Sequence, residues 1–335
     1  MNHFEYARPS SEGEAAALLA EHDGNTAVLA GGTDLFNLLN RDLVSPARLV
    51  DLKSIPSLGE VSETLDGIRI GAAVTLDTLA RHPLLSGRFA AIHTVIDGIR
   101  SIQVQAMGTL AGDLCLAPNC WYFRSGYGLL AMRDGESLVE TGRNEHHAIL
   151  GNRGPAKFVS ASRFAPALIA LGARVRIVGP GPEETTVLPA EAFFVSPKTE
   201  RQGTTVLRPG QFISHIEIPW DGELRSATYE VVRGEGLDWP MATASVSAVV
   251  SSGVVLSAKI VMGHVAPTPW IAHTAAQALV GQRLTEETAS RVADIAVAPA
   301  TPLSENEYKV QIARTAVKRA LVRLAEQFPT DGGVV

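Results

Sequence analysis

The segment Leu29-Ala-Gly-Gly-Thr-Asp-Leu35 decides how the chain folds around it, because it joins an apolar strand to a helix through two glycines. An apolar run of strand length covers Thr26–Ala30, and leucines recur at helical spacing after the turn. Glycines let a backbone approach a ligand closely, and the N–H groups at a helix start favour phosphate. The segment therefore predicts a phosphate-binding turn, although a Gly-Gly pair before a helix is also common in a turn without a ligand.

Short elements surround this turn in the order strand, helix, strand, turn, helix, strand. The expected elements are a strand at Phe4–Tyr6, a helix through Ala15–Leu19 and a strand at Arg48–Leu52. Ser11 and Glu14 have the spacing of a capping box at the start of the first helix. This alternation favours an α/β arrangement for the N-terminal part of the chain.

A second turn of small residues, Thr109-Leu-Ala-Gly-Asp113, lies between apolar segments further along the chain. Two such turns can hold the two phosphates of a dinucleotide from opposite sides. Neither turn has the G-x-G-x-x-G pattern or a phosphate loop with Gly-Lys-Ser/Thr, so the common nucleotide motifs are absent.

The C-terminal third of the chain has a different pattern. Three strands and then three helices are expected, over Ala227–Arg233, Ala242–Ser251, Val254–Val265, Trp270–Val280, Glu286–Val297 and Glu305–Glu326. Strands followed by helices, instead of alternating with them, indicate a separate α+β domain.

Composition and charge exclude several classes of protein. The 335 residues are 46% hydrophobic and 19% charged, as in folded globular proteins. A net charge of −6 without a basic run argues against a nucleic-acid partner. Polar residues at the N-terminus and the lack of any uncharged apolar window of about eighteen residues lead us to expect no secretory signal, no membrane span and a cytoplasmic location.

An ordered set of motifs resembles one family over nearly the whole chain. The set consists of Ala30-Gly-Gly-Thr-Asp-Leu35, Asp51-Leu-Lys53, Ile68-Arg-Ile-Gly-Ala72, Thr109-Leu-Ala-Gly-Asp-Leu114, Leu207-Arg-Pro-Gly-Gln211, Ile216-Glu-Ile-Pro219, Gly263-His-Val-Ala-Pro267, Pro269-Trp270 and Asn306-Glu-Tyr-Lys309. In order and spacing it resembles the FAD-binding medium subunit of molybdenum hydroxylases, the group of xanthine dehydrogenase, carbon monoxide dehydrogenase and aldehyde oxidoreductase.

The resemblance implies an α+β protein with a two-lobed FAD-binding fold like that of vanillyl-alcohol oxidase. Lobe 1 would cover residues 1–56, and lobe 2 would cover residues 57–219 with an irregular insertion at about 119–160. A smaller α+β C-terminal domain, a three-stranded sheet plus helices, would cover residues 220–330.

The resemblance also implies which residues contact FAD. The first turn would hold the pyrophosphate through Leu29, Ala30, Gly31, Gly32, Thr33, Asp34 and Leu35, and the second through Thr109, Ala111, Gly112 and Asp113. Ile213 matches an apolar residue near the flavin, and Asp238 and Trp239 match a segment near the isoalloxazine ring. Trp239 is equally well interpreted as a core aromatic residue.

Two departures from the family pattern affect this site. The second turn is usually Thr-Ile-Gly-Gly-Asn, so Ala111 replaces a glycine and Asp113 replaces asparagine. A carboxylate beside pyrophosphate is repulsive unless it accepts backbone or ribose hydrogen bonds. Arg163 stands where relatives often have an FAD-contacting aspartate, and we expect it either to meet a phosphate or to face solvent.

The insertion resembles a loop in the medium subunit of 4-hydroxybenzoyl-CoA reductase and in some periplasmic aldehyde oxidoreductases. There the loop carries four cysteines that hold a [4Fe–4S] cluster, which needs one thiolate per iron. Here only Cys120 matches, because the positions near 127–129, Leu138 and Ala156 lack cysteine and Cys115 precedes the loop. We expect that the loop is kept, that the cluster is lost and that this chain holds no metal.

The function implied by the resemblance is electron transfer. Electrons from a molybdopterin centre in a large subunit would pass through [2Fe–2S] clusters in a small subunit to FAD, and then to NAD, a quinone, a ferredoxin or oxygen. A heterotrimer or its dimer is expected, with no catalytic acid or base in this chain. A stand-alone flavin oxidase and a structural subunit with a degraded FAD site are the alternatives, and the substrate stays open.

Overall fold

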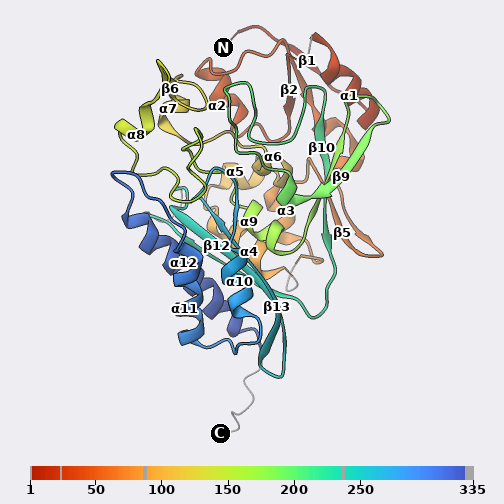
Figure 1. The fold of residues 1–335 in the computed structure, drawn as a ribbon. Helices are drawn as coiled ribbons and strands as arrows, with labels where there is room; N and C mark the ends of the chain where they lie inside the picture. The colour runs from red at the N-terminus through yellow and green to blue at the C-terminus, as the bar shows by residue number, and fades with distance from the viewer. Residues whose placement is uncertain (1, 23–24, 86–88, 235–237, 329–335) are drawn as a thin grey trace.

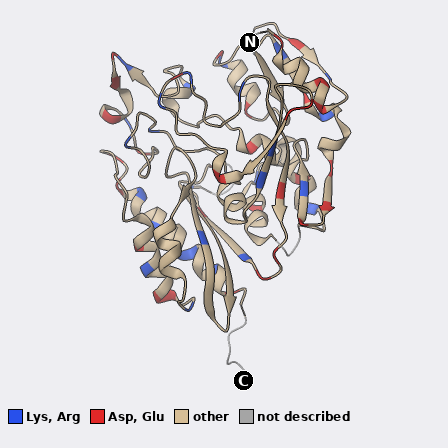
Figure 2. Cartoon of the chain, turned by 45° about the vertical axis from the view of Figure 1, so that its right-hand side comes forward, with Lys and Arg blue, Asp and Glu red and all other residues tan. Residues whose placement is uncertain are grey.

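The computed structural model describes residues 2–22, 25–85, 89–234 and 238–328 (Figure 1). Its strands form a three-stranded, a five-stranded and a four-stranded sheet, with a small two-stranded sheet in the insertion. Figure 2 shows the Lys and Arg residues interspersed with Asp and Glu over these elements. Among the described residues, we find no helix that combines the length and the apolar character needed to cross a membrane.

The N-terminal sheet is parallel and has the order β1-β3-β2. Its strands are β1 (Glu5–Ala7), β2 (Thr26–Leu29) and β3 (Arg48–Asp51), and the accompanying helices are α1 (Glu12–Ala20) and α2 (Leu35–Asn40). Ser11 caps α1 by accepting a hydrogen bond from the N–H of Glu14, as the capping-box spacing predicts. The sheet therefore delivers the first glycine turn directly to the start of α2.

The central sheet is antiparallel and has the order β4-β5-β10-β8-β9. Its strands are β4 (Val61–Thr64), β5 (Gly67–Gly71), β8 (Arg174–Val178), β9 (Thr185–Pro189) and β10 (Phe212–Pro219). The accompanying helices are α3 (Leu76–Arg81), α4 (Ala90–Gly98), α5 (Ile102–Met107), α6 (Leu110–Leu114) and α9 (Ala165–Ala170), with 3-10 turns η2 (Leu52–Ser54), η3 (Pro56–Gly59) and η4 (Ala190–Ala192). One apolar core joins these elements to α1 and β3.

The C-terminal sheet has four strands, which corrects the expected three. The elements are β11 (Arg225–Val231), β12 (Ala242–Ser251), β13 (Val254–Gly263), β14 (Trp270–Ile271), α10 (His273–Leu279), α11 (Glu286–Val297) and α12 (Tyr308–Ala325). The helix expected from Trp270 begins only at His273, because Trp270 and Ile271 form the edge strand β14 and pair with β13.

The two faces of β12 have different partners. Alternate residues from Ala242 to Ala248 belong to a core shared with α10, α11 and α12, which lie beside the sheet (Figure 1). The hydroxyl residues between them are also buried, and Ser247 donates a hydrogen bond of 2.6 Å to the carbonyl oxygen of Ala170 in α9. Since strand residues alternate between faces, this serine and threonine face joins the C-terminal domain to the rest of the chain.

The insertion contains α7 (Trp121–Arg124), β6 (Met132–Arg133), β7 (Glu136–Ser137) and α8 (Leu138–Thr141). Hydrogen bonds to the segment before α12 hold it against the C-terminal domain. The side-chain amide of Asn144 donates to Ser304, and that of Asn152 donates to the carbonyl oxygen of Thr301. The insertion is therefore fixed against the C-terminal domain.

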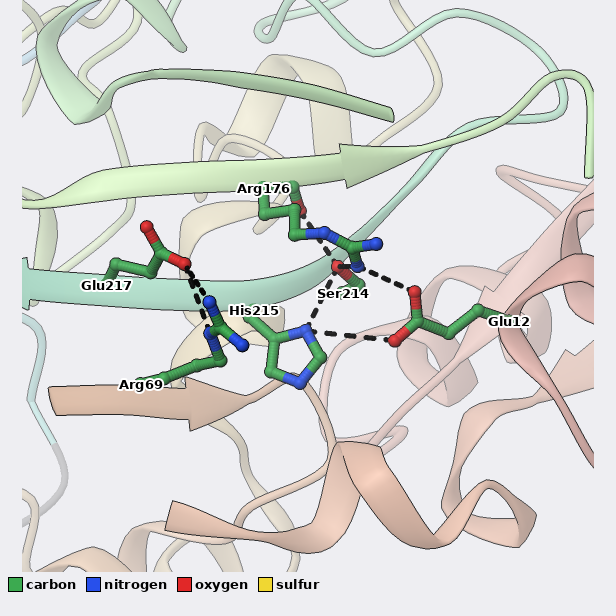
Figure 3. A network of polar contacts seen from close by, with 6 residues as sticks. All are labelled: Glu12, Arg69, Arg176, Ser214, His215 and Glu217. Carbon is green, nitrogen blue, oxygen red and sulfur yellow. Dashed lines mark hydrogen bonds and ion pairs between the residues drawn. The ribbon is translucent and has the colours of Figure 1, made fainter. Parts of the chain in front are cut away.

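A polar network connects α1 to the central sheet (Figure 3). Arg176 on β8 forms an ion pair of 2.6 Å with Glu12 and donates to the hydroxyl of Ser214, also at 2.6 Å. His215 Nδ1 lies 3.8 Å from Glu12, and burial lowers the pKa of this histidine. Because the side chains of Arg176 and Glu12 are only 26% and 21% exposed, this network contributes more to the stability of the fold than a surface ion pair does.

Arg176→Ala is expected to lower the free energy of unfolding by about 1 to 2 kcal/mol, because Glu12 and Ser214 lose a half-buried partner. Urea unfolding followed by circular dichroism measures the change. The control is Arg81→Ala, which removes a pair whose arginine is 79% exposed. That control is expected to change stability by at most about 0.5 kcal/mol, and equal losses in the two variants would contradict the prediction.

Candidate functional site

A cavity of about 1010 Å³ lies between the two small-residue turns, the insertion and the segment after β11. Every residue predicted for the site lines this cavity except Leu29, which is 6% exposed and belongs to β2. The sequence therefore identified side chains that the fold brings to one place. It did not identify the insertion residues Trp121 and Arg124, which also line the cavity.

The first turn presents bare backbone to the cavity. Gly32 has a φ of +70°, a conformation that glycine adopts without strain. A Cβ at Gly31 would lie 1.9 Å from the carbonyl oxygen of Met107, so the turn packs directly on the backbone just before the second turn. Within the described part of the chain, the N–H groups of Gly32 and Thr33 have no hydrogen-bond partner. A glycine cradle with free N–H groups is suited to an anion.

The second predicted turn is the N-terminus of a short helix. Thr109 caps α6, and its hydroxyl accepts a hydrogen bond of 3.0 Å from the N–H of Gly112. Ala111 is buried in the first turn of α6. Its methyl group therefore occupies core space, and the replacement of a glycine at this position needs no unusual backbone conformation.

Asp34 lines the cavity, but its carboxylate is bound to the insertion. It accepts two hydrogen bonds from Arg124, at 2.7 and 3.2 Å, and a third from the N–H of Ala117. This paired, bidentate arrangement is stronger than a single neutral hydrogen bond. Asp34 thus fixes the start of α2 relative to the insertion.

The carboxylate of Asp113 accepts backbone hydrogen bonds, which is one of the two arrangements expected for a carboxylate at this turn. The N–H groups of Arg163 and Phe164 donate to it at 3.2 and 3.1 Å, and the hydroxyl of Ser162 donates a further hydrogen bond. Burial raises the pKa of Asp113 to about 6 despite these contacts. Its carboxylate is directed to the start of α9.

Arg163 does not face solvent, which corrects one of the two expectations for it. The residue is 7% exposed, lines the cavity and forms an ion pair with Glu230 on β11. Its Nε donates to Glu230 at 3.1 Å. Burial raises the pKa of Glu230, and Arg163 opposes that rise. The sequence contained no local signal for Glu230, because the pair joins residues far apart in the chain.

The apolar side of the cavity includes Ile213 and Trp239. Ile213 on β10 is 3% exposed and belongs to the main core. Trp239 is 38% exposed, with its ring centroid 6.3 Å from that of His264. Trp239 is therefore not a core aromatic residue, and its indole is available to a ligand in the cavity.

The insertion folds around a small apolar cluster. Leu130, Ala156 and Phe158 are buried together, and Cys120, Leu129 and Met132 pack against them. The cluster includes Cys120, Ala156 and Leu129, which belong to three of the four regions where cysteines would be expected. Among the described residues, no group of three His, Cys, Asp or Glu side chains is placed to hold a metal ion.

Lys309 on α12 holds the insertion against the C-terminal domain. It is 1% exposed, and its Nζ donates to the carbonyl oxygens of His146, His147 and His264 at 3.1, 3.0 and 2.9 Å. Burial lowers the pKa of Lys309 to about 7. The histidine pair that lines the cavity therefore depends on a buried lysine of the C-terminal domain.

Lys309→Met is expected to remove a pH dependence of stability. The folded protein binds the proton of Lys309 less tightly than the unfolded chain does. The free energy of unfolding of wild type therefore rises relative to that of the variant between about pH 7 and pH 10, by at most about 1.4 kcal/mol per pH unit. Below about pH 7 the difference becomes constant, since both states then bind the proton. Urea unfolding of both proteins between pH 6 and 9.5 measures it, and a constant difference across that range would contradict the prediction.

Comparison with known proteins places this geometry among flavoproteins. A family model described as the FAD binding domain in molybdopterin dehydrogenase matches residues 2–221, and one described as the CO dehydrogenase flavoprotein C-terminal domain matches residues 227–324. The carbon monoxide dehydrogenase medium chain of Hydrogenophaga pseudoflava is 26% identical over 324 residues, which is 95% of this chain and 96% of the relative.

Two further matches also span the chain. The FAD-binding subunit of an aldehyde oxidoreductase from Escherichia coli strain K12 is 28% identical, over 98% of this chain and 100% of that one. The solved structure of reconstituted CO dehydrogenase from Oligotropha carboxidovorans aligns with a TM-score of 0.77 at 25% identity, over 98% of this chain and 99% of that one.

Proposed function

Because this chain belongs to the family of FAD-binding medium subunits of molybdenum hydroxylases, we propose that it holds one FAD between its two small-residue turns. The observation that carries the proposal is the glycine cradle at Gly31 and Gly32 beside free N–H groups, in a cavity large enough for a dinucleotide. We keep the proposed division into lobes 1–56 and 57–219 and a domain 220–330.

The residues of the chain bind and orient the cofactor in this proposal. The N–H groups of Gly32 and Thr33 donate to the diphosphate, and the apolar side chains near Ile213 shield the ring end from water. Asp238 and Trp239 lie along the edge of the ring. Bound FAD supplies the redox chemistry, so the chain needs no acid or base of its own.

The chain acts as a subunit of a larger oxidoreductase in this proposal. Its relatives are named as medium chains of carbon monoxide dehydrogenases and as an FAD-binding subunit of an aldehyde oxidoreductase. By this likeness we assign it a large molybdopterin subunit and a small [2Fe–2S] subunit as partners, in a cytoplasmic heterotrimer. The small subunit donates electrons, and the large subunit selects the substrate.

We also propose that the insertion works without iron. Three of the regions that would carry cysteines meet in an apolar cluster, which gives the loop a core of its own. Asn144, Asn152 and Lys309 supply further contacts that need no metal. In this proposal the insertion forms a wall of the cavity and takes no part in electron transfer.

The test is to count FAD, iron and molybdenum per protomer in the complex purified with its native partners. About one FAD and about four irons are expected, the irons belonging to two [2Fe–2S] clusters of the small subunit. A surplus of about four irons would overturn the proposal for the insertion. A colourless protein without FAD would overturn the proposal for the site, and purification of an active flavoprotein without molybdenum would favour a stand-alone oxidase.

A further inference from the structure

Lys53 contacts the first glycine turn from outside the cavity. It lies in η2, directly after β3, and its Nζ donates a hydrogen bond of 2.7 Å to the carbonyl oxygen of Ala30. Ala30 lines the cavity and Lys53 does not. The strands β2 and β3 are parallel neighbours, with Leu29 paired to Asp51, so the turn and η2 both follow the carboxyl edge of the sheet. Ligands of open α/β sheets bind at this edge.

The hydrogen bond from Lys53 sets the orientation of the peptide group between Ala30 and Gly31. This peptide bond is trans, and a trans peptide is planar, with its carbonyl oxygen and its N–H on opposite sides. Because the oxygen is directed to Lys53, the N–H of Gly31 is directed away from the lysine. Over the described residues, that N–H has no hydrogen-bond partner. Gly31 lines the cavity, so its N–H is available to a ligand there.

A buried carboxylate holds the lysine in this orientation. Asp51 is 4% exposed, and its Oδ1 lies 2.7 Å from Lys53 Nζ and accepts a hydrogen bond of 3.0 Å from the N–H of Lys53. Its Oδ2 accepts a hydrogen bond of 2.5 Å from the hydroxyl of Tyr6 on β1. Burial raises the pKa of Asp51, but the hydrogen bonds from Lys53 and Tyr6 outweigh burial and bring the pKa below its usual value. The carboxylate is therefore charged at neutral pH and retains Lys53.

The charges at this edge of the sheet favour an anion only while the lysine is present. The carboxylate of Asp51 would by itself repel a diphosphate bound at the adjacent turn, and the ammonium group of Lys53 neutralises it. The carbonyl oxygen of Ala30 carries partial negative charge, which the same ammonium group balances through a charge-assisted hydrogen bond. Lys53 therefore removes two sources of repulsion from the turn, in addition to directing the N–H of Gly31.

We propose that Lys53 is a positioning residue of the diphosphate site, which holds the carbonyl oxygen of Ala30 away from the ligand and presents the N–H of Gly31 to it. This inference rests on the proposed FAD site. Without the lysine side chain the peptide group is free to rotate, and its oxygen then competes with its N–H for the side that faces the phosphate oxygens. The motif Asp51-Leu-Lys53, which is part of the resemblance in sequence, thereby acquires a role toward the cofactor.

The experiment measures FAD affinity in the native complex after its FAD has been removed, by titration with FAD and measurement of flavin fluorescence. Lys53→Met is expected to raise the dissociation constant of FAD about tenfold, since it removes one charge-assisted hydrogen bond from the turn. Lys53→Arg retains a cationic donor and is expected to restore most of the affinity. The matched control is Lys259→Met, because Lys259 forms an ion pair of 2.9 Å with Glu191, is 36% exposed where Lys53 is 37% exposed, and lies outside the cavity lining.

Two further measurements separate positioning from support of the fold. In Lys53→Met, the backbone N–H of residue 53 and the hydroxyl of Tyr6 still donate to Asp51, so the FAD-free complex is expected to keep its thermal stability. In the oxidised complex saturated with FAD, the phosphorus-31 NMR signals of the bound cofactor are expected to shift relative to wild type. The visible absorbance bands of the flavin are expected to keep their wavelengths, because the change is confined to the diphosphate.

The outcomes separate this inference from the proposed function. If wild type and Lys53→Met bind FAD equally tightly, the role of Lys53 is wrong and the FAD site stands. Equal weakening in Lys53→Met and Lys259→Met, an affinity that Lys53→Arg does not restore, or unchanged phosphorus signals would also overturn the inference. A native wild-type complex that contains no FAD would overturn the proposed function itself.

Discussion

Gly31→Ala is expected to abolish FAD retention, reducing the bound cofactor from about one per protomer to less than about one tenth. The added Cβ would lie 1.9 Å from the carbonyl oxygen of Met107 and 2.7 Å from its carbonyl carbon. Backbone atoms cannot rotate away as a flexible side chain can, so the two turns must separate. A displacement of about 1 Å is enough to spoil a site that holds a ligand from both sides. Flavin absorbance after gel filtration measures the retained FAD.

The matched control is Gly59→Ala, because a Cβ at Gly59 meets nothing within 4 Å. It is expected to retain FAD and stability. Gly32→Val is a second test, since Gly32 has a φ of +70° and its Cβ would lie 2.6 Å from the ring of Phe36. The thermal unfolding of the FAD-free proteins is measured in parallel. If the FAD-free Gly31→Ala protein also loses most of its thermal stability relative to wild type, the turn has an architectural role only.

Local patterns predicted the parts of the fold that depend on neighbouring residues. The limits of α11 agree with the expected Glu286–Val297, because its capping threonine and its apolar stripe are both local signals. The N-cap of α3 is likewise a local contact, since the side chain of Thr75 accepts a hydrogen bond from the N–H of Thr78. The two turns were found because glycine and small residues are needed wherever two backbones approach, and this need is visible in sequence.

Contacts between distant segments could not be predicted in this way. The strand β14 consists of only Trp270 and Ile271, and its identity depends on pairing with β13 instead of on any pattern of its own. Likewise we expected Arg163 to meet either a phosphate or solvent, and neither expectation included Glu230 on β11. Sequence periodicity reports which face is buried, whereas the partner on that face is decided by tertiary packing.

Glu230→Ala is expected to lower the free energy of unfolding by about 3 kcal/mol or more, because it leaves the guanidinium of Arg163 buried without its partner. The side chains of Arg163 and Glu230 are only 9% and 7% exposed, so water cannot replace the lost carboxylate. Urea unfolding of the FAD-free chain at pH 7 measures the effect. The control is Glu217→Ala, which breaks the more exposed pair with Arg69 and is expected to cost less than about 1 kcal/mol.

The double variant Arg163→Met with Glu230→Leu shows whether the buried charge is the cause. A buried ion pair contributes little net stability over apolar residues of similar size, whereas a single unpaired charge is strongly unfavourable. The double variant is therefore expected to recover to within about 1 kcal/mol of wild type. If it is as unstable as Glu230→Ala alone, the loss comes from packing around β11 and not from the charge. Retention of FAD by the double variant would further show that the guanidinium at this wall of the cavity supports the fold and is not a phosphate ligand.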